Sequence, residues 1–163
     1  MRKVIANTTP LIALANIDQL ELLHKLYGTI IIPQAVMDEI VRDPARQRVR
    51  GSSWIKVEAI RDQSQKDIFR ARLHAGEVEV MILAREQKAD LVIMDDNAAK
   101  KTAKFLGFNV TGTLGVLLKA KKEGYLEKIE PVMNELIRDG LFISDTVKRY
   151  VLREAGEVFY SQR

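Results

Sequence analysis

Two apolar segments of this sequence are each followed by side chains that can bind a metal ion. Asn7 follows residues 3–6, and the adjacent carboxylates Asp95 and Asp96 follow residues 91–94. Carboxylate and amide oxygens are hard ligands, which favour Mg²⁺ or Mn²⁺. Such an ion can activate water and stabilise charge on a phosphodiester. The acidic pair also has a plainer interpretation, in which Asp96 caps the next helix and Asp95 lies in a turn.

The segment before the acidic pair brings another acid toward it. Residues 77–87 have apolar side chains at positions 78, 80, 81, 82, 83 and 84, which predicts a helix largely buried against a sheet. This helix rises by about 16 Å and a strand at 91–94 returns by a similar distance, so we expect Glu77 close to Asp95. Glu77 and Glu79 are about 200° apart around the helix axis, so only one can point to this site. We choose Glu77, because it is nearer the helix start, where the dipole favours an anion.

An earlier helix offers one more acid. Pro33 opens a predicted helix that reaches Val41, and both Asp38 and Glu39 lie at the margins of its apolar face. Periodicity does not choose between them. Further upstream, Asp18 and Glu21 predict a capping box for a helix that runs to Leu26.

The segments that position these side chains alternate between strand and helix patterns. Strands are predicted at Lys3–Ala6, Thr29–Ile32, Trp54–Val57, Leu91–Met94 and Phe108–Val110, with helices including Leu11–Asn16, Arg61–His74, Asn97–Leu106 and Leu114–Lys122. This alternation predicts an α/β fold with a parallel sheet between helical layers and right-handed crossovers. Ligands bind such sheets at the carboxyl ends of the strands, where Asn7, Glu77 and Asp95 fall. Two more helices, Glu127–Asp139 and Ser144–Glu157, carry no chemical motif, so we expect them to serve packing, dimerisation or partner binding.

Polar groups that suit an anion occur near the same edge. Thr111-Gly112-Thr113 offers backbone N–H groups and hydroxyls at a strand-to-helix turn, although Thr113 is equally an ordinary helix cap. Lys100, Lys101 and Lys104 lie on the outward face of the predicted helix beside Asp95. They suit a nucleic-acid backbone, but a solvated helix face is the more frequent explanation of such a pattern.

Composition limits the class of protein. The 163 residues, 47% of them hydrophobic, predict one domain, with an α/β core at 1–124 and a helical extension at 125–163. There is no cysteine and there are two histidines, so a metal must be held mainly by oxygen. The net charge of +4 weakly favours a polyanionic partner. No stretch is apolar enough to cross a membrane and polar residues interrupt the apolar run near the start, so we expect a cytoplasmic protein without a secretion signal.

At this point the sequence resembles the PIN-domain family. The motifs that carry the resemblance are VIANTTPLIALANI, QAVMDEI, GEVEVMILA, ADLVIMDDNAAKKTAKFLGF and VTGTLGVLLKAKKEGYL, which together cover nearly the whole chain. The resemblance implies a three-layer α/β/α sandwich with a five-stranded parallel sheet. It also implies a nuclease that uses Mg²⁺ or Mn²⁺ to cleave RNA, typically as the toxin of a toxin-antitoxin pair, with a small antitoxin protein as partner and a homodimer as assembly.

The resemblance also assigns residues. The family's acidic positions fall on Asn7, Glu39, Glu77 and Asp95, with Asp96 as an auxiliary metal ligand, so the family pattern selects Glu39 over Asp38. Thr8 and Thr113 match its small hydroxyl residues, and with Lys100 and Lys101 they are the predicted substrate contacts. Position 7 departs from the pattern, because asparagine keeps one ligand oxygen but lacks the negative charge. We therefore expect weakened metal binding and a weak or inactive enzyme.

Two other classes of function compete with this hypothesis. A non-catalytic PIN-like module would bind RNA or protein through its basic helix and its C-terminal helices, without any need for metal. A signalling receiver domain is the third class, but receivers place their acidic pair after the first strand, whereas Asp95 and Asp96 follow the fourth.

Overall fold

The computed structural model describes residues 2–69 and 73–157 of the chain, and its centre is a sheet of parallel strands. The strands are β1 (Val4–Ala6), β2 (Ile30–Pro33), β3 (Ile55–Glu58), β4 (Leu91–Ile93) and β5 (Val110–Thr111). Their order is β3-β2-β1-β4-β5, and Val4 of β1 pairs with Ile30 on one side and Leu91 on the other. The predicted five-stranded parallel sheet is confirmed.

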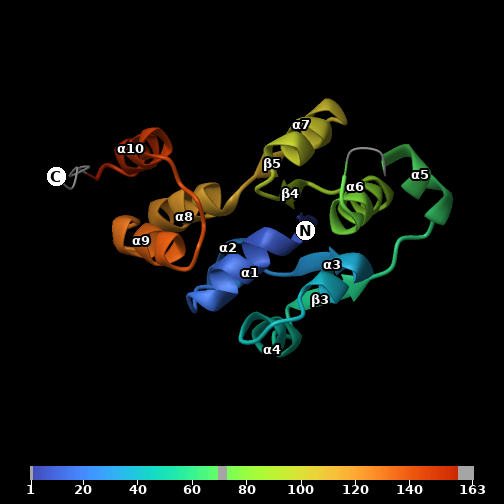
Figure 1. The fold of residues 1–163 in the computed structure, drawn as a ribbon, viewed down its shortest axis with the longest axis horizontal. Helices are drawn as coiled ribbons and strands as arrows, with labels where there is room; N and C mark the ends of the chain where they lie inside the picture. Colours follow the sequence, from blue (N-terminus) through green and yellow to red (C-terminus); the bar gives the residue numbers. More distant parts are fainter. Residues whose placement is uncertain (1, 70–72, 158–163) are drawn as a thin grey trace.

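Helices flank both faces of the sheet (Figure 1). Their bounds are α1 (Thr8–Asn16), α2 (Glu21–Tyr27), α3 (Gln34–Glu39), α4 (Ala45–Arg50), α5 (Lys66–Phe69), α6 (Ala75–Gln87), α7 (Asn97–Phe105), α8 (Thr113–Lys122), α9 (Glu130–Arg138) and α10 (Asp145–Glu154), with a 3₁₀ turn η1 (Gln63–Gln65) before α5. In Figure 1 the sheet is seen between α6 on one side and α1, α2 and α8 on the other. This arrangement is the expected three-layer α/β/α sandwich.

The core explains why the central strands read as uninterrupted apolar runs. All residues of β1, β2 and β4 are buried, because helices cover both faces of the sheet at these strands. Helix α6 is buried from Gly76 to Ala84, as its broad apolar pattern predicts. β1, β4 and α6 are thus held in place by burial, and the residues at their ends form the candidate site.

The strand order places a topological switch point at the carboxyl end of β1. The chain leaves β1 toward β2 and β3, and after β3 it crosses back to β4 on the other side of β1. Asn7, directly after β1, donates its backbone N–H to the carbonyl of Ile93 at the end of β4, at 2.8 Å. The two strand ends are thus joined where open α/β sheets bind their ligands.

Several local predictions differ from the structure, and the helix predicted to reach Val41 ends at Glu39. The capping box at Asp18 and Glu21 is wrong, because Leu20 precedes α2 in a helical conformation with no side-chain cap, and Asp18 has a positive φ of 61°. Of the helix predicted at Arg61–His74, the described residues form η1 and α5, because Asp62 has an extended conformation and its side chain caps η1. Residues 70–72 of that prediction lie outside the described residues. The last predicted helix ends at Glu154, three residues before the predicted Glu157, and positions 158–163 of the predicted extension also lie outside the described residues.

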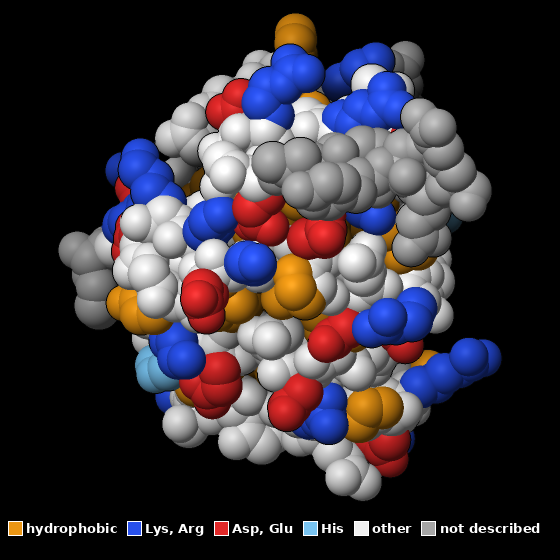
Figure 2. Space-filling view, turned by 90° about the vertical axis from the view of Figure 1, so that its left-hand side faces the viewer, with side chains coloured by type: hydrophobic (Ala, Val, Ile, Leu, Met, Phe, Trp, Pro, Cys, Tyr) orange, Lys and Arg blue, Asp and Glu red, His pale blue; other side chains and the backbone are white. Residues whose placement is uncertain are grey.

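The face formed by the C-terminal helices carries mixed charge. Figure 2 views the molecule from the side on which α8, α9 and α10 lie in Figure 1. On this face lysine and arginine side chains are interspersed with acidic and hydrophobic ones, instead of forming one continuous basic surface. A polyanion would therefore meet acids as well as cations here.

Candidate functional site

Asn7 lies at the junction of β1 and β4 with an unused acceptor. Its side chain is 5% exposed, and Oδ1 is buried with no hydrogen-bond partner among the described residues. An unpaired buried amide oxygen costs free energy, so such an atom calls for an explanation. Because an amide oxygen is a suitable ligand for a hard cation, a metal ion would satisfy it.

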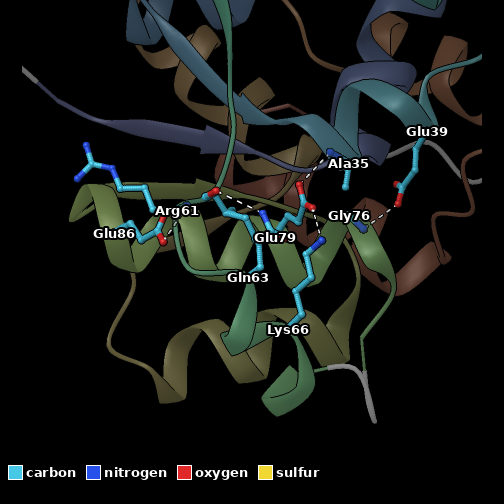
Figure 3. A network of polar contacts seen from close by, with 9 residues as sticks. Ala35, Glu39, Arg61, Gln63, Lys66, Gly76, Glu79 and Glu86 are labelled. Atoms are coloured by element: carbon cyan, nitrogen blue, oxygen red, sulfur yellow. Dashed lines mark hydrogen bonds and ion pairs between the residues drawn. The ribbon is translucent and has the colours of Figure 1, made fainter.

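Glu39, the last residue of α3, is held by donors from two other segments. Its Oε2 accepts a hydrogen bond from the Thr8 hydroxyl at 2.6 Å, and its Oε1 accepts one from the backbone N–H of Gly76 at 2.8 Å. Figure 3 shows this carboxylate directed at the start of α6. A Cβ at position 76 would lie 2.6 Å from Oε1, so only glycine leaves room for this contact.

Asp38 is oriented differently from its neighbour Glu39. Its Oδ1 accepts a hydrogen bond from the side chain of Gln34, one turn earlier on the same helix, at 2.8 Å. Of the two acids that periodicity could not separate, the structure therefore gives Glu39 the contacts with Thr8 and Gly76.

Glu77 and Glu79 are both buried, and they point to different places. Glu77 Oε1 accepts a hydrogen bond from the backbone N–H of His74 at 3.0 Å, which holds it at the start of α6. Glu79 instead accepts from the N–H of Ala35 at the start of α3, at 3.0 Å, and pairs with Lys66 at 3.2 Å (Figure 3). Glu77, the residue after Gly76, therefore stays at the start of α6, whereas Glu79 contacts the start of α3, the end opposite Glu39.

Asp95 follows β4 and is held by a single residue. Its Oδ1 accepts from the backbone N–H of Thr113 at 2.7 Å, and its Oδ2 accepts from the Thr113 hydroxyl at 2.6 Å. The Thr111-Gly112-Thr113 turn thus offers its donors to an anion, as the sequence suggested, and in the structure that anion is Asp95. A Cβ at position 112 would lie 2.6 Å from Asp95 Oδ1 and 2.8 Å from Lys100 Nζ, so this glycine too is required by a carboxylate.

Of the remaining predicted residues, some cap a helix or lie on the surface and others contact the site carboxylates or line the cavity beside them. Asp96 is exposed and its Oδ1 accepts from the N–H of Ala99 at 2.8 Å, so it caps α7. Lys100, half-buried, lines a cavity of about 250 Å³ together with Asp95 and Thr113. Lys101 is exposed and does not belong to that lining. Thr8 and Thr113 both use their hydroxyls to hold a site carboxylate.

The candidate site therefore has two halves that meet at Asn7. The Glu39 half consists of Thr8, Glu39, Gly76 and Glu77, and the Asp95 half consists of Asp95, Lys100, Gly112 and Thr113. Sequence reasoning missed Gly76, which stands directly before Glu77, and included Gly112 only as part of an anion-binding turn, without its close approach to Asp95. Among residues 2–69 and 73–157, no group of three or more acidic or histidine side chains is already arranged to hold a metal ion.

The oxygen atoms nonetheless fit a hard cation. Each hydrogen-bonded carboxylate oxygen of Glu39 and Asp95 keeps a further lone pair, and Asn7 Oδ1 has no protein partner. Protein donors that orient ligand carboxylates are the usual surroundings of a bound metal. The residues present are therefore compatible with Mg²⁺ or Mn²⁺ and unsuited to soft metals.

A comparison with protein families identifies the class. A family model described as a PIN domain matches residues 3–157, so the chain belongs to the PIN-domain family. No curated protein and no solved structure matches the chain significantly. PIN domains have a nuclease-type fold and are generally dependent on divalent metal ions. Within the described residues, no helix is long and apolar enough to cross a membrane.

Proposed function

We propose that this protein is a metal-dependent ribonuclease of the PIN type, with weakened activity because asparagine stands at position 7. The observation that carries the proposal is the junction at Asn7. There the end of β1 is bonded to the end of β4, which leads to Asp95, while the next residue, Thr8, donates its hydroxyl to Glu39. The segments that carry these carboxylates are thus joined at one sheet edge, and a bound cation would offset repulsion between the acids.

Each residue of the two halves has a defined part in this proposal. Asp95, Glu77 and Glu39 would hold Mg²⁺ or Mn²⁺, with Asn7 supplying one oxygen and Asp96 acting as an auxiliary ligand. When bound, the ion would supply water activation and neutralise charge on the phosphodiester. Lys100 and Lys101 would bind the RNA backbone, and Thr8 and Thr113 would orient the two carboxylates that they contact.

The family resemblance supports further proposals about context. A PIN ribonuclease of this kind would act in the cytoplasm as the toxin of a toxin-antitoxin pair, as a homodimer controlled by a small antitoxin protein. A short open reading frame for a DNA-binding protein directly upstream of the gene would support this, and its absence would count against it.

The decisive experiment compares Asn7→Asp with the unchanged chain in cleavage of single-stranded RNA with Mn²⁺. An aspartate at position 7 adds a negative charge and a second oxygen, so we expect cleavage to become about tenfold faster or more. Asp95→Asn and Glu39→Gln in the Asn7→Asp background should lose more than about 100-fold, exceeding the cost of an outer-shell change. The matched control is Asp38→Asn, which should cleave normally because Asp38 contacts Gln34 on the exposed face of α3.

Metal binding gives a second readout that does not depend on cleavage. Mn²⁺ should raise the melting temperature, and raise it more in Asn7→Asp, because a ligand that binds only the folded state stabilises it. Absence of cleavage by both the unchanged chain and Asn7→Asp would overturn the enzyme proposal. So would cleavage that persists unchanged in Asp95→Asn.

A non-catalytic module that binds RNA or protein is the second candidate. It is favoured by the missing charge at Asn7 and by the fact that both oxygens of Glu39 and Asp95 already have protein donors. RNA binding would then be salt-sensitive, independent of metal and unaffected by Asp95→Asn.

A further inference from the structure

The cavity beside Asp95 opens to a displayed aromatic ring. Its lining combines Asp95, Lys100 and Thr113 of the Asp95 half with Phe142 and Val147 from the C-terminal part of the chain. Phe142 is 88% exposed, which is unusual for a large apolar side chain. The cavity therefore joins a cation, a candidate catalytic acid and an uncovered aromatic face.

The exposure of Phe142 follows from the way its segment is anchored. Residues 140–144 connect α9 to α10, and the neighbours Leu141 and Ile143 both pack against the core. Leu141 and Ile143 are half-buried against the core, whereas the ring of Phe142, between them, is left exposed. The N–H of Leu141 bonds to the carbonyl of Leu136 at 3.0 Å, and Ser144 caps α10, so both ends of the segment are fixed.

The chemistry of this cavity matches one nucleotide of an unpaired strand. A nucleotide offers a flat π-face and a negative phosphate, and an aromatic ring and the Lys100 side chain both line this cavity. The lining mixes apolar side chains with Asp95, Asn97, Lys100 and Thr113, which suits an occupant that has both a flat apolar part and a charged part. Aromatic residues that stack bases beside cations are the general solution for binding single strands.

We propose that Phe142 is the stacking platform for an unpaired RNA base whose phosphate is bound by Lys100 next to Asp95. This rests on the proposed ribonuclease function and adds a substrate-binding residue, Phe142, that requires an unpaired base. Bases of a duplex are already stacked on their neighbours, so a paired strand cannot use the Phe142 ring.

The test measures binding of short oligoadenylate and oligouridylate without divalent metal, so that cleavage does not interfere. Phe142→Ala should weaken binding by about 5- to 150-fold, the range for loss of one base-aromatic stack. Phe142→Leu, which keeps apolar volume without a π-face, should weaken binding similarly. Phe142→Trp, which keeps a π-face, should bind as well as the unchanged chain. The matched control is Phe105→Ala, since Phe105 is 89% exposed but lies outside the cavity lining.

Phe142→Trp also reports stacking directly. The chain has one tryptophan, Trp54, which is buried, so a tryptophan at 142 adds a distinct exposed emission. Oligonucleotide should quench this emission, and an abasic oligomer of the same length should not. A tryptophan placed at position 105 should respond to neither.

The outcomes separate this inference from the proposed function. RNA binding that depends on Phe142, without cleavage even in Asn7→Asp, would support the platform and overturn the nuclease. Cleavage by the nuclease with unchanged binding in Phe142→Ala would overturn the platform alone. Loss of self-association in Phe142→Ala, with RNA affinity unchanged, would make Phe142 a protein contact and would also overturn it.

Discussion

The two halves of the candidate site hold a carboxylate in the same way but depend on different parts of the fold. Glu39 accepts one hydrogen bond from a threonine hydroxyl and one from a backbone N–H, and so does Asp95. Each carboxylate also lies so close to a glycine that a Cβ added to that glycine would clash with it. For Glu39 the donors come from α1 and α6, whereas for Asp95 both come from Thr113. The orientation of Glu39 is therefore a property of packing, and that of Asp95 is a property of one turn.

The packing of the Glu39 half is reciprocal. Glu79 of α6 accepts from the backbone at the start of α3, while Glu39 of α3 accepts from the backbone at the start of α6 (Figure 3). Helices α3 and α6 are thus joined by two carboxylate contacts, one at each end of α3. Among the described residues the Asp95 half shows no such pair of contacts, and Asp95 lines a cavity together with Lys100. We infer that the Glu39 half would set the position of a metal ion, and that the Asp95 half would contribute one ligand, Asp95, and face the substrate.

The largest effects are expected when a methyl group is added at Gly112 or at Gly76. In Gly112→Ala, Asp95 must leave Thr113, so we expect more than about 100-fold loss of cleavage and a loss of about 1–3 kcal/mol of unfolding free energy from the unpaired groups. In Gly76→Ala, the longer and exposed Glu39 can swing outward, so we expect about tenfold loss of cleavage. The stability of Gly76→Ala should be nearly unchanged. The loss of the hydrogen bond between Gly76 and Glu39 is offset by the preference for alanine over glycine in a helix, about 0.5–1 kcal/mol.

Single-turnover cleavage in the Asn7→Asp background and urea unfolding provide both measurements. Gly51→Ala is the control, because the nearest atom to its added methyl would be a backbone oxygen of Gln47 at 3.2 Å, away from both halves. Equal losses in Gly76→Ala and Gly112→Ala would refute the distinction between packing and turn.

A smaller effect is expected from removing one hydroxyl in each half. Thr113 is fully buried and supplies both donors to Asp95, so Thr113→Val should lower cleavage by about 10- to 100-fold. Thr8 is half-buried and Glu39 keeps its bond to Gly76, so Thr8→Val should cost less than about tenfold. Thr113→Ser, which retains the hydroxyl, should recover most of the rate. A larger loss in Thr8→Val than in Thr113→Val would contradict the assignment of roles.

Local patterns predicted the strands and the helix that carry the site, because buried elements leave a periodic or continuous pattern of apolar residues in the sequence. The apolar runs located β1, β4 and α6, and the rule that parallel strands share a carboxyl edge brought Asn7 and Asp95 together. The contrast between Glu77 and Glu79 also followed from helix geometry alone. These inferences need only short stretches of sequence and one topological rule.

Long-range contacts explain what the sequence could not provide. Asp38 and Glu39 have equivalent positions on α3, and only Thr8 and Gly76, 31 and 37 residues from Glu39, distinguish them. The donors of the Thr111-Gly112-Thr113 turn could be assigned to Asp95 only after β4 and β5 were paired. Phe142 belongs to no sequence motif, and its exposure became visible only when Leu141 and Ile143 were seen to pack, half-buried, against the core.

The smallest expected effect concerns how the C-terminal helices are attached to the Asp95 half. Glu157 accepts hydrogen bonds from the N–H groups of Ile129 and Glu130 at the start of α9 and from Lys121 of α8, the helix that begins with Thr113. Burial raises the pKa of this carboxyl, but the hydrogen bonds and the Lys121 charge lower it more, so the net pKa lies below its usual value. Its stabilising effect is therefore complete above the unfolded pKa of about 4.5 and disappears as the pH falls through the lower folded value.

We expect Glu157→Gln to cost about 1–2 kcal/mol of unfolding free energy at neutral pH, since bonds to a charged group are lost. The difference from the unchanged chain should shrink as urea unfolding is repeated below pH 4.5. Glu154→Gln, at an exposed position on α10, is the control and should match the unchanged chain throughout. Because α8 carries Thr113 and the 140–144 segment carries Phe142, Glu157→Gln should also weaken RNA binding slightly while leaving the Mn²⁺ thermal shift unchanged. If the thermal shift fell and RNA binding did not, the division of the site into a metal-positioning half and a substrate-facing half would be reversed.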